Sequence, residues 1–581
     1  MFFYNEEFDL TGHLPDDSEG FYMLCYQLSQ VWVHYVVSGN FRGLSMESIL
    51  LDVTEIQEVI QAVIPGQRTT LALERDQIMQ IESENHCYHA GRIISSTSLK
   101  MWMDIVDLQL QKKEMRREGD GGLLKRSFPR TLERCQKCTQ SALRCQSVRE
   151  TGAGIISSNS STVAAVTMAR VETSSSRPYH LIIFGASGFT GQFVVEEVAR
   201  VASEGPNGNL KWAVAGRSKQ KLEKPELRSV DVIVADVGEP GSLAAMCKQA
   251  VIVLNCVGPY RFFGEQMVKA CVENGAHQID ISGEPQFLEG MQLNYDSQAA
   301  EQGVYVIGSC GFDSIPADMG VLFTRTIQGT LTAVESFLTF GTGEDGGCLH
   351  DGTWQSAVHG FSEGHELQTL RRKFNHKPLP TVGSKIKRRG NLFFSNEVQQ
   401  YSVPFLGSDP SVVKRTQRFL LEEHQDKPVQ YGAYVGIGGI GNVFKMLFGG
   451  LIFWLFVKFS FGRKLLLKHP EFFSFGVFSM DGPTRKQMKD STFQFEFFGE
   501  GYTEGQDPSQ GKPNGKIRTL VKGPECAYVA TPIAMVQSAL TMLNEPTALP
   551  KKGGVYTPAA LFAKTTLTDR LHKHGIEFTV L

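Results

Sequence analysis

Residues 179–191 read Tyr179-His-Leu-Ile-Ile-Phe184, followed directly by Gly185-Ala-Ser-Gly188-Phe-Thr-Gly191. The first part is short and apolar, as expected of a buried β-strand, and apolar residues at helical spacing follow the third glycine. A glycine-rich turn between a strand and a helix lets the backbone approach a phosphate, and the free N–H groups at the helix N-terminus attract an anion. We therefore predict a unit that cradles the pyrophosphate of a dinucleotide. The alternative is a turn that serves only close helix–sheet packing.

Short apolar runs of strand length alternate with helical periodicity after this point. The predicted strands are 181–184, 212–215, 230–235, 251–254, 278–281 and 304–307. Such alternation is typical of an α/β fold with a doubly wound parallel sheet and right-handed crossovers. We therefore predict a Rossmann domain over residues 178–312.

The chain that follows is predicted to form a mixed α+β domain over residues 313–529, for substrate binding or dimerisation. Three predicted strands, 335–340, 493–498 and 516–522, have no regular helices between them. In the second of them, phenylalanines alternate with polar residues, as in a half-solvated antiparallel sheet. Helices within residues 530–581 are expected to pack back on the Rossmann domain.

The first 170 residues differ in composition from the rest. They contain polar and basic stretches and a Ser/Thr run at 157–162, and they are poor in strand-length apolar runs. We interpret residues 1–170 as an N-terminal extension that is largely disordered or non-native, with Met168 as an alternative start.

The composition of the 581-residue chain limits its function. With 41% hydrophobic residues it can bury a large core, which excludes a wholly disordered or fibrous protein. A net charge of −3 without a sustained basic stripe argues against nucleic acid as a partner. Eleven cysteines are too sparse for a disulfide framework, which favours a reducing, intracellular compartment. Two fragments, His86–His89 and Cys135–Cys138, lack the second ligand pair that zinc requires, so no metal site is predicted.

The ends of the predicted strands favour NADP(H) over NAD(H). The second strand is followed by Arg217 and Ser218, which suit a 2′-phosphate, whereas NAD sites usually place a carboxylate there. The alternative for Arg217 is an exposed arginine after a turn, without a cofactor role. Asp236 is predicted to accept from the adenine amino group, and its alternative is to cap the following helix. The predicted cofactor-binding residues are Gly185, Ser187, Gly188, Phe189, Thr190, Gly191, Arg217, Ser218, Asp236, Asn255, Val257, Gly258 and Pro259.

Several separated motifs resemble the saccharopine dehydrogenase family. They are Gly185–Gly191, Ala215–Ser218, Val253–Tyr260, Asp280–Glu284 and Gly311-Phe-Asp-Ser-Ile-Pro316. The resemblance begins at Met168 and runs to the end of the chain, and it implies an NADP-binding Rossmann domain followed by a mixed α/β domain. The same family includes trans-acting enoyl reductases of bacterial glycolipid synthesis, which share an element like the last motif.

Three side chains are candidates for catalysis. Glu284 and Asp313 follow the fifth and sixth predicted strands and could handle a proton, and Tyr260 could donate to a developing oxyanion or enolate. The alternative for Asp313 and Ser314 is to cap the helix that begins near Pro316. The sequence leaves these roles open.

The resemblance implies an NADP(H)-dependent oxidoreductase that acts on a lipid-like or acyl substrate in lipid or glycolipid metabolism. A non-catalytic NADP-binding sensor or scaffold at a lipid surface is an alternative. An amino-acid dehydrogenase of the saccharopine type is a weaker one, because we find no Arg/Lys set near the cofactor loops to clamp substrate carboxylates.

Residues 443–478 are predicted to contact a lipid surface without spanning a bilayer. They contain 10 of the 38 phenylalanines, flanked by lysines and arginines. Only 12 uncharged residues separate Lys445 from Lys458, too few to cross a hydrocarbon core of about 30 Å. The alternatives are a buried helix or the interface of a homodimer. A membrane or lipid-droplet location is expected, with the mitochondrion as an alternative.

Overall fold

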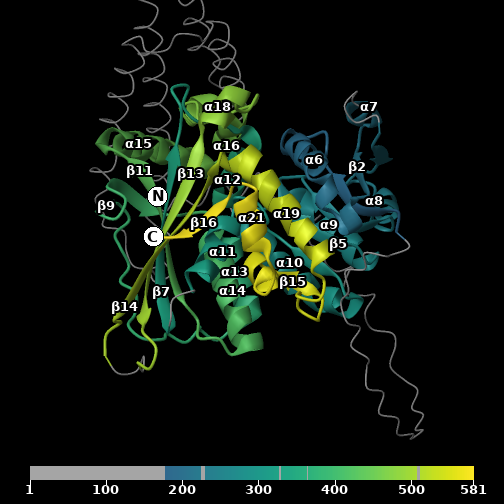
Figure 1. Ribbon diagram of the computed structural model, residues 1–581. Helices are drawn as coiled ribbons and strands as arrows, with labels where there is room; N and C mark the ends of the chain where they lie inside the picture. The colour runs from purple at the N-terminus through teal and green to yellow at the C-terminus, as the bar shows by residue number, and fades with distance from the viewer. Residues whose placement is uncertain (1–176, 224–228, 326–328, 363, 507–510) are drawn as a thin grey trace, which may run out of the picture. The chain divides into compact units, whose positions relative to one another are not determined.

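The computed structural model describes residues 177–581, except 224–228, 326–328, 363 and 507–510. The predicted extension over residues 1–170, with its two Cys/His fragments, lies outside the described residues. The described part of the chain contains two seven-stranded sheets and one two-stranded sheet, with helices around and between them (Figure 1).

The first sheet is parallel throughout, and its strand order is β3-β2-β1-β4-β5-β6-β15. All six strands predicted in this part of the sequence form, each within two residues of its expected bounds. The strand order reverses between β1 and β4, and ligands bind at the carboxyl ends of strands at such a switch point. The predicted Rossmann fold is confirmed. The strands are β1 (Tyr179–Phe184), β2 (Trp212–Gly216), β3 (Asp231–Val234), β4 (Ala250–Asn255), β5 (His277–Asp280), β6 (Tyr305–Ile307) and β15 (Gly554–Tyr556).

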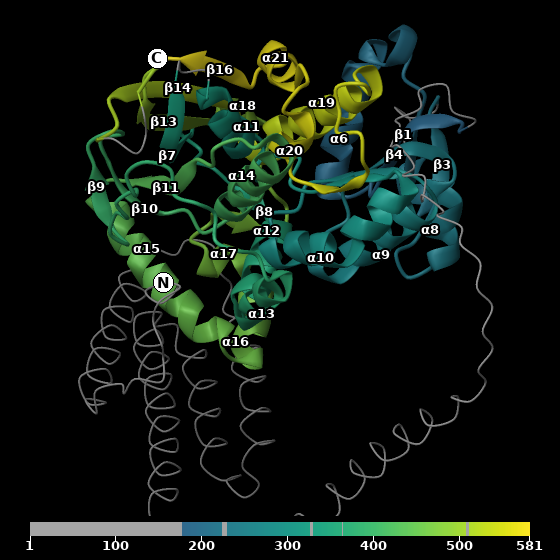
Figure 2. The same ribbon diagram turned by 90° about the horizontal axis from the view of Figure 1, so that it is seen from below.

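Helices cover both faces of this sheet. On one face, α6 (Phe189–Arg200) packs against α19 (Thr531–Asn544). On the other face lie α8 (Pro240–Cys247), α9 (Tyr260–Glu273) and α10 (Pro285–Gln302), and Figure 2 shows the sheet between the two layers. The apolar runs of β1 and β4 are therefore buried on both sides, which explains why they read as continuous rather than alternating.

The second sheet is mixed, with the order β16-β14-β13-β7-β11-β10-β9. Strand β11 runs parallel to β7, and every other neighbouring pair is antiparallel. The three strands predicted here form as β7, β13 and β14, whereas β9, β10 and β11 were not predicted. The strands are β7 (Thr330–Gly341), β9 (Phe393–Ser395), β10 (Gln400–Pro404), β11 (Gln430–Gly438), β13 (Thr492–Tyr502), β14 (Gly515–Pro524) and β16 (Glu577–Val580).

The inner face of this sheet is covered by helices α11 (Ile315–Thr324) and α14 (Asp409–His424). Phe493, Phe495 and Phe497 are buried, and the residues between them are more exposed, as the alternation predicts. A Cβ at Gly320 of α11 would lie 2.3 Å from the Phe497 ring, so the glycine is what allows this close approach. The predicted mixed α+β fold of this part of the chain is confirmed.

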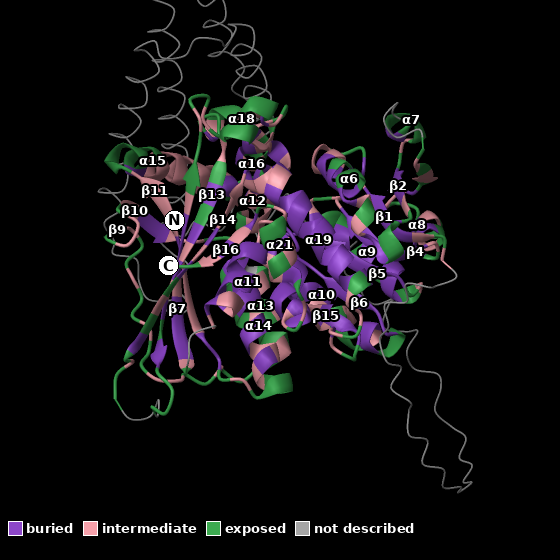
Figure 3. Ribbon diagram, in the orientation of Figure 1, coloured by how far each residue is buried: buried purple, intermediate pink, exposed green. Residues whose placement is uncertain are grey.

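A group of helices beyond this core forms what we call the apolar layer: α15 (Ile440–Val457), α16 (Ser460–Lys468) and α17 (Pro470–Phe473). The layer packs against α12 (Asp351–Ser362), whose Trp354 and Val358 are buried in a shared cluster. Among the described residues, two helices are long and apolar enough to cross a membrane by length and composition alone. They are Ile440–Val457, of which 11% is buried, and Cys526–Asn544, of which 83% is buried, and Figure 3 shows this contrast.

The C-terminal region contains more than the helices predicted for residues 530–581. Helices α19 and α21 (Leu567–Lys573) form as expected, and α19 contacts α6, β4 and β5 of the Rossmann domain. Two short strands were missed: β15 pairs with β6 in the first sheet, and β16 pairs with β14 in the second. The last residues of the chain therefore complete both sheets.

Candidate active site

The glycine loop after β1 has the backbone geometry that a phosphate cradle needs. Gly185 has φ +87°, and a Cβ there would lie 2.8 Å from Val257 Cγ2, so the loops after β1 and β4 touch. A Cβ at Gly191 would lie 2.1 Å from the Gly185 carbonyl oxygen, which only glycine avoids. No side chain caps α6 at Gly188, so the first N–H groups of this helix remain available to an anion. These residues fit a dinucleotide pyrophosphate.

The carboxyl end of β2 fits a 2′-phosphate. The Arg217 side chain is exposed there, and no carboxylate pairs with it among the described residues. The Ser218 hydroxyl accepts from the Lys221 N–H at 3.4 Å and so caps the short helix α7 (Lys219–Leu222). Asp236 Oδ1 accepts from the Gly238 N–H at 2.9 Å, which places this side chain in a local turn.

The loop after β4 joins the predicted cofactor residues to the predicted catalytic ones. Asn255 Oδ1 accepts from the Val257 N–H at 3.1 Å, and Asn255 Nδ2 is buried without a partner. The peptide between Gly258 and Pro259 is cis, and Pro259 is the N-cap of α9. Because α9 begins here, the first residues of this helix lie beside the loop that faces the cofactor site.

The second domain reaches the glycine loop through Phe189, the first residue of α6. The ring stacks on His350 with centroids 4.4 Å apart, and it meets Tyr528 edge to face at 4.9 Å. The Tyr528 hydroxyl accepts from the His350 N–H at 2.8 Å. Tyr528 lies in a π-helical turn, Cys526–Ala530, a feature frequent at functional sites. The start of the cofactor-binding helix is therefore held by residues from two distant parts of the chain, His350 and Tyr528.

The hydroxyl of Tyr260 is fully engaged within the protein. It donates to the Asn255 carbonyl oxygen at 2.8 Å and accepts from the Ile281 N–H at 3.4 Å. Burial, with the charge of Asp280, raises the pKa of this phenol well above its ordinary value. This arrangement ties β4 to β5 and leaves little capacity for a substrate.

Glu284 is held in place by three donors. Its carboxylate accepts from the Tyr260 N–H at 3.0 Å, the Arg261 N–H at 3.1 Å and the Ser356 hydroxyl at 2.9 Å. The first two donors are N–H groups at the start of α9, where the helix dipole favours a negative charge. Glu284 therefore ties α9 to α12 at the edge of the site.

Asp313 is different, because no described side chain forms a hydrogen bond with its carboxyl group. The group lies against the backbone of Gly283, where a Cβ would come within 2.6 Å of Asp313 Oδ1. Burial, with the charges of Glu284 and Asp280, raises the pKa of Asp313 to about 7. The neighbouring Ser314 hydroxyl donates to Asp409 at 3.1 Å, so the helix-capping alternative does not occupy either side chain. Asp313 can therefore carry or release a proton near neutral pH.

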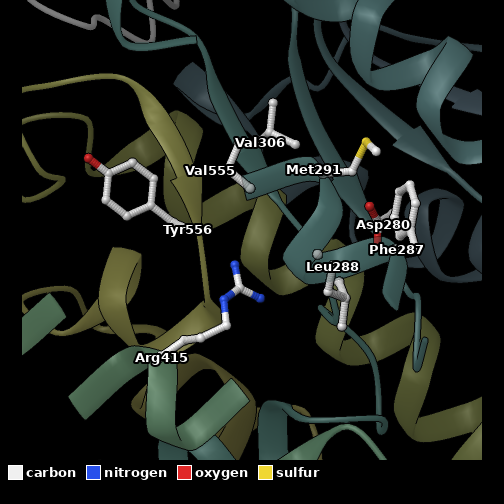
Figure 4. A pocket seen from close by; sticks show the side chains of 9 residues that line it. Asp280, Phe287, Leu288, Met291, Val306, Arg415, Val555 and Tyr556 are labelled. Atoms are coloured by element: carbon white, nitrogen blue, oxygen red, sulfur yellow. The ribbon is translucent and has the colours of Figure 1, made fainter. Parts of the chain in front are cut away.

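Asp280 lies behind this site and was not predicted to take part. It accepts from the N–H groups of Ser282 and Ser309 and from Gln278, yet burial still raises its pKa to about 7. Asp280 and Arg415 line a small cavity of about 10 Å³ (Figure 4). Its open core holds about one water molecule, so it is no dinucleotide site.

Replacing Glu284 by Gln is expected to move the titration of Asp313 to lower pH. The substitution removes a negative charge that favours the protonated form of Asp313 and keeps an oxygen for the α9 N–H groups. A carbon-13 NMR titration of the labelled Asp313 carboxyl measures the shift without any substrate. The control is Glu265→Gln, on the exposed side of α9, which should leave the titration where it is. An unchanged titration in Glu284→Gln would show that the charge of Glu284 does not contribute to the pKa of Asp313.

The residues of the loops were predicted from the sequence, whereas Asp280 and Ser356 were missed. Asp280 had a readable signal, because it is a carboxylate at the end of a buried strand. Ser356 had none, since it meets Glu284 only after the two halves of the fold come together.

Comparisons with known proteins agree with this geometry. Residues 181–307 match the family model described as "Saccharopine dehydrogenase NADP binding domain". The chain is 59% identical over 420 residues to the saccharopine dehydrogenase-like oxidoreductase of Mus musculus, which covers 70% of this chain and 98% of that protein. It is 39% identical over 420 residues to the "Lipid droplet localized protein" of Caenorhabditis elegans, which covers 69% and 97% of the two chains. A putative trans-acting enoyl reductase of Mycobacterium tuberculosis is 34% identical over 155 residues, which is 26% of this chain and 36% of that one.

This chain is an NADP(H)-binding protein of the oxidoreductase class, as shown by its Rossmann sheet, its glycine-rich loop after β1 and the exposed Arg217 after β2. Within that class, the chain belongs to the saccharopine dehydrogenase-like oxidoreductases of the saccharopine dehydrogenase family. The expected family and cofactor are therefore confirmed.

Proposed function

We propose that the protein is an NADP(H)-dependent reductase of an acyl or lipid-like substrate, with Asp313 as the proton donor. The observation that carries the proposal is the carboxyl group of Asp313, which has a pKa of about 7 and no hydrogen-bonding side chain among the described residues. Bound NADPH supplies a hydride. Asp313 holds the proton that the substrate takes up with it, so that an activated double bond or carbonyl becomes saturated. The partial relative named as an enoyl reductase supports this substrate class.

The other two predicted candidates assist Asp313. Glu284 adds to the effect of burial in raising the pKa of Asp313. Its carboxylate is held beside the site by two N–H groups of α9. Tyr260 joins the ends of β4 and β5 and so holds the loop that carries Gly283, on which Asp313 rests. Tyr260 and Glu284 are buried, whereas Asp313 is half-buried, as a group that must meet a substrate has to be.

The experiment that tests the reaction class follows the loss of NADPH absorbance against a panel of substrates. The panel contains α,β-unsaturated acyl thioesters, long-chain ketones and amino acids paired with 2-oxo acids. Turnover of the first two groups supports the proposal. Turnover of the amino-acid group alone would favour the saccharopine-type alternative, and NADPH binding without any turnover would favour a sensor or scaffold.

We further propose that the apolar layer attaches the protein to a lipid surface, as predicted for residues 443–478. Only Val443 and Val457 of α15 are buried, although it is an apolar helix of 18 residues. Phe444 is 68% exposed, Phe459 64% and Phe475 53%, which is unusual for rings that are to face water. Lys458 lies 3.3 Å from the ring centre of Trp454, and Arg463 donates to the Val457 carbonyl at the end of α15, so cations flank the apolar surface.

The helix is longer than the uncharged run recognised in the sequence, because it begins at Ile440 and includes Lys445. At about 1.5 Å per residue it measures about 27 Å, close to the thickness of a hydrocarbon core. The exposed rings of α16, α17 and the segment after them lie beside it, and they suit a helix lying within the interface. The relative named for lipid droplets supports a droplet monolayer as that surface.

Replacing Phe444 and Phe459 by Ser is expected to release the protein from lipid. Each exposed ring is expected to contribute on the order of 1 kcal/mol to attachment, so the double variant should partition about tenfold or more towards the soluble fraction. Flotation with phospholipid-coated triolein droplets measures this. The control is Phe394→Ser, 49% exposed on strand β9 of the second sheet. Phe453 and Phe456 are unsuitable for this test, because both pack against the buried cluster of α12. Equal flotation of the double variant and the native protein would contradict the lipid-surface proposal.

A further inference from the structure

Two large apolar rings stand exposed at the edge of the site. Phe262 is 45% exposed and Phe263 is 39% exposed, and both lie in the first turn of α9. Their N–H groups donate to the Pro259 carbonyl oxygen, at 3.1 and 3.3 Å, so the rings are fixed to the loop that follows β4. Adjacent exposed phenylalanines beside a cofactor loop are typical of a surface that a ligand covers.

Helix α12 connects these rings to the apolar layer. On one side, His359 meets the Phe262 ring edge to face at 5.0 Å, and the Gly360 carbonyl accepts from Gln286 at 3.4 Å. Phe361 lies in the same last turn of α12 and is 43% exposed. Its ring meets that of Phe453 of α15 edge to face, with ring centres 5.5 Å apart. We call Phe262, Phe263 and Phe361 the aromatic patch.

The rest of α12 has the same two-sided arrangement. Ser356 donates to Glu284 beside the site, whereas the Trp354 indole donates to the Leu466 carbonyl of α16 at 2.7 Å. The helix therefore separates the candidate active site from the apolar layer by its own width. Figure 2 shows α12 between α10 and the α15–α17 group.

We propose that the aromatic patch binds the hydrocarbon chain of the substrate, with the carbonyl-bearing end at Arg261 and the far end directed past Phe361 towards the apolar layer. The Arg261 guanidinium lies 5.8 Å from the Phe262 ring centre, so a cation stands at the inner end of the patch. This inference rests on the proposed function and specifies where the acyl chain lies. The hydrocarbon chain is the single occupant of the patch, because a protein partner or a second copy of the chain there would cover the loop where the substrate must react.

The inference is tested with saturated fatty acids of 8, 12 and 16 carbons that compete with the fluorescent fatty acid cis-parinarate for the NADPH-loaded protein. In the native protein, affinity is expected to rise with chain length. In the variant Phe262→Ser/Phe263→Ser, the 16-carbon acid is expected to bind about a hundredfold more weakly, at roughly tenfold for each ring, and the dependence on length should flatten. Phe394→Ser serves again as the control and should behave as the native protein does.

A second variant guards against misfolding of the first. Phe361 lies at the outer end of the patch. Phe361→Ser is therefore expected to weaken binding of the 16-carbon acid about tenfold and to leave binding of the 8-carbon acid unchanged. Unchanged binding of the 16-carbon acid in both variants would overturn the inference. So would conversion of a native dimer to a monomer by either variant, since the patch would then be an interface.

The outcomes separate this inference from the proposed function. NADPH affinity and droplet flotation should stay at native values in both variants, because neither the glycine loop nor the exposed rings of α15 are altered. If the native protein reduces acyl substrates and the patch variants do so with native dependence on chain length, the proposed function holds and the position of the chain is wrong.

Discussion

The variant Asp313→Asn is expected to lose between about a hundredfold and ten thousandfold in kcat on the acyl substrate that the panel selects, while it binds NADPH as the native protein does. Asparagine keeps the size of the side chain and its place against Gly283 but cannot release a proton. In the native protein, activity should be present below pH 7 and decline as the pH rises through the pKa of Asp313, because the protonated form is the donor.

The stability of Asp313→Asn provides a control for folding, because this variant is expected to lose activity and yet to be more stable than the native protein. The folded pKa of about 7 lies above the usual value of about 3.9, so the folded protein retains a proton that the unfolded chain loses as the pH rises from about 4 to about 7. Native stability therefore falls across this window and stays lowered above it. Asp313→Asn should melt at a higher temperature than the native protein at pH 8. The exposed control Asp345→Asn should keep its activity. Full activity in Asp313→Asn would exclude this residue as the donor.

Replacing Arg217 by Asp is expected to weaken NADPH binding by about 10- to 150-fold, which corresponds to about 1.5–3 kcal/mol for a charged contact. The side chain is exposed after β2 and has no carboxylate partner among the described residues, so its removal breaks no internal ion pair there. NADH should bind equally well or better, because an aspartate accepts from a ribose 2′-hydroxyl.

Fluorescence titration with NADPH and NADH measures both affinities. Lys219→Ala is the matched control, since Lys219 is an exposed cation on the next helix that pairs with Glu223 at 3.4 Å. A preference for NADPH that survives Arg217→Asp would place the 2′-phosphate elsewhere.

Local pattern was sufficient to predict six of the seven strands of the Rossmann sheet, all except β15. Each of the predicted strands is a short apolar run. In the loop that follows the first of them, a Cβ at Gly185 or Gly191 would lie too close to neighbouring atoms. Gly188 begins the helix whose first N–H groups remain available to an anion. The same local reasoning placed Glu284 and Asp313 at the ends of consecutive strands.

The rest depended on contacts between distant residues. Strand β11 is rich in glycine and only partly buried, so it lacks the pattern of a strand and forms because β7 and β10 pair with it. Asp313 has an unusual pKa only because Glu284 and Asp280 lie near it after folding. The role of Ser356 depends on α12 reaching Glu284 across 72 residues of sequence.

The position of β15 and β16 has a consequence for biosynthesis. Strand β6 gains its last neighbour from residues 554–556, and β14 gains its last neighbour from residues 577–580. A ribosome that releases the chain from the N-terminus onwards must therefore expose the unpaired edges of β6 and β14 until residues 554–556 and 577–580 emerge. Both sheets are completed by contacts between segments far apart in sequence, which slows folding. A nascent chain stalled before residue 554 is expected to recruit chaperones, and a chain long enough to bring residues 554–580 out of the ribosome is expected to release them.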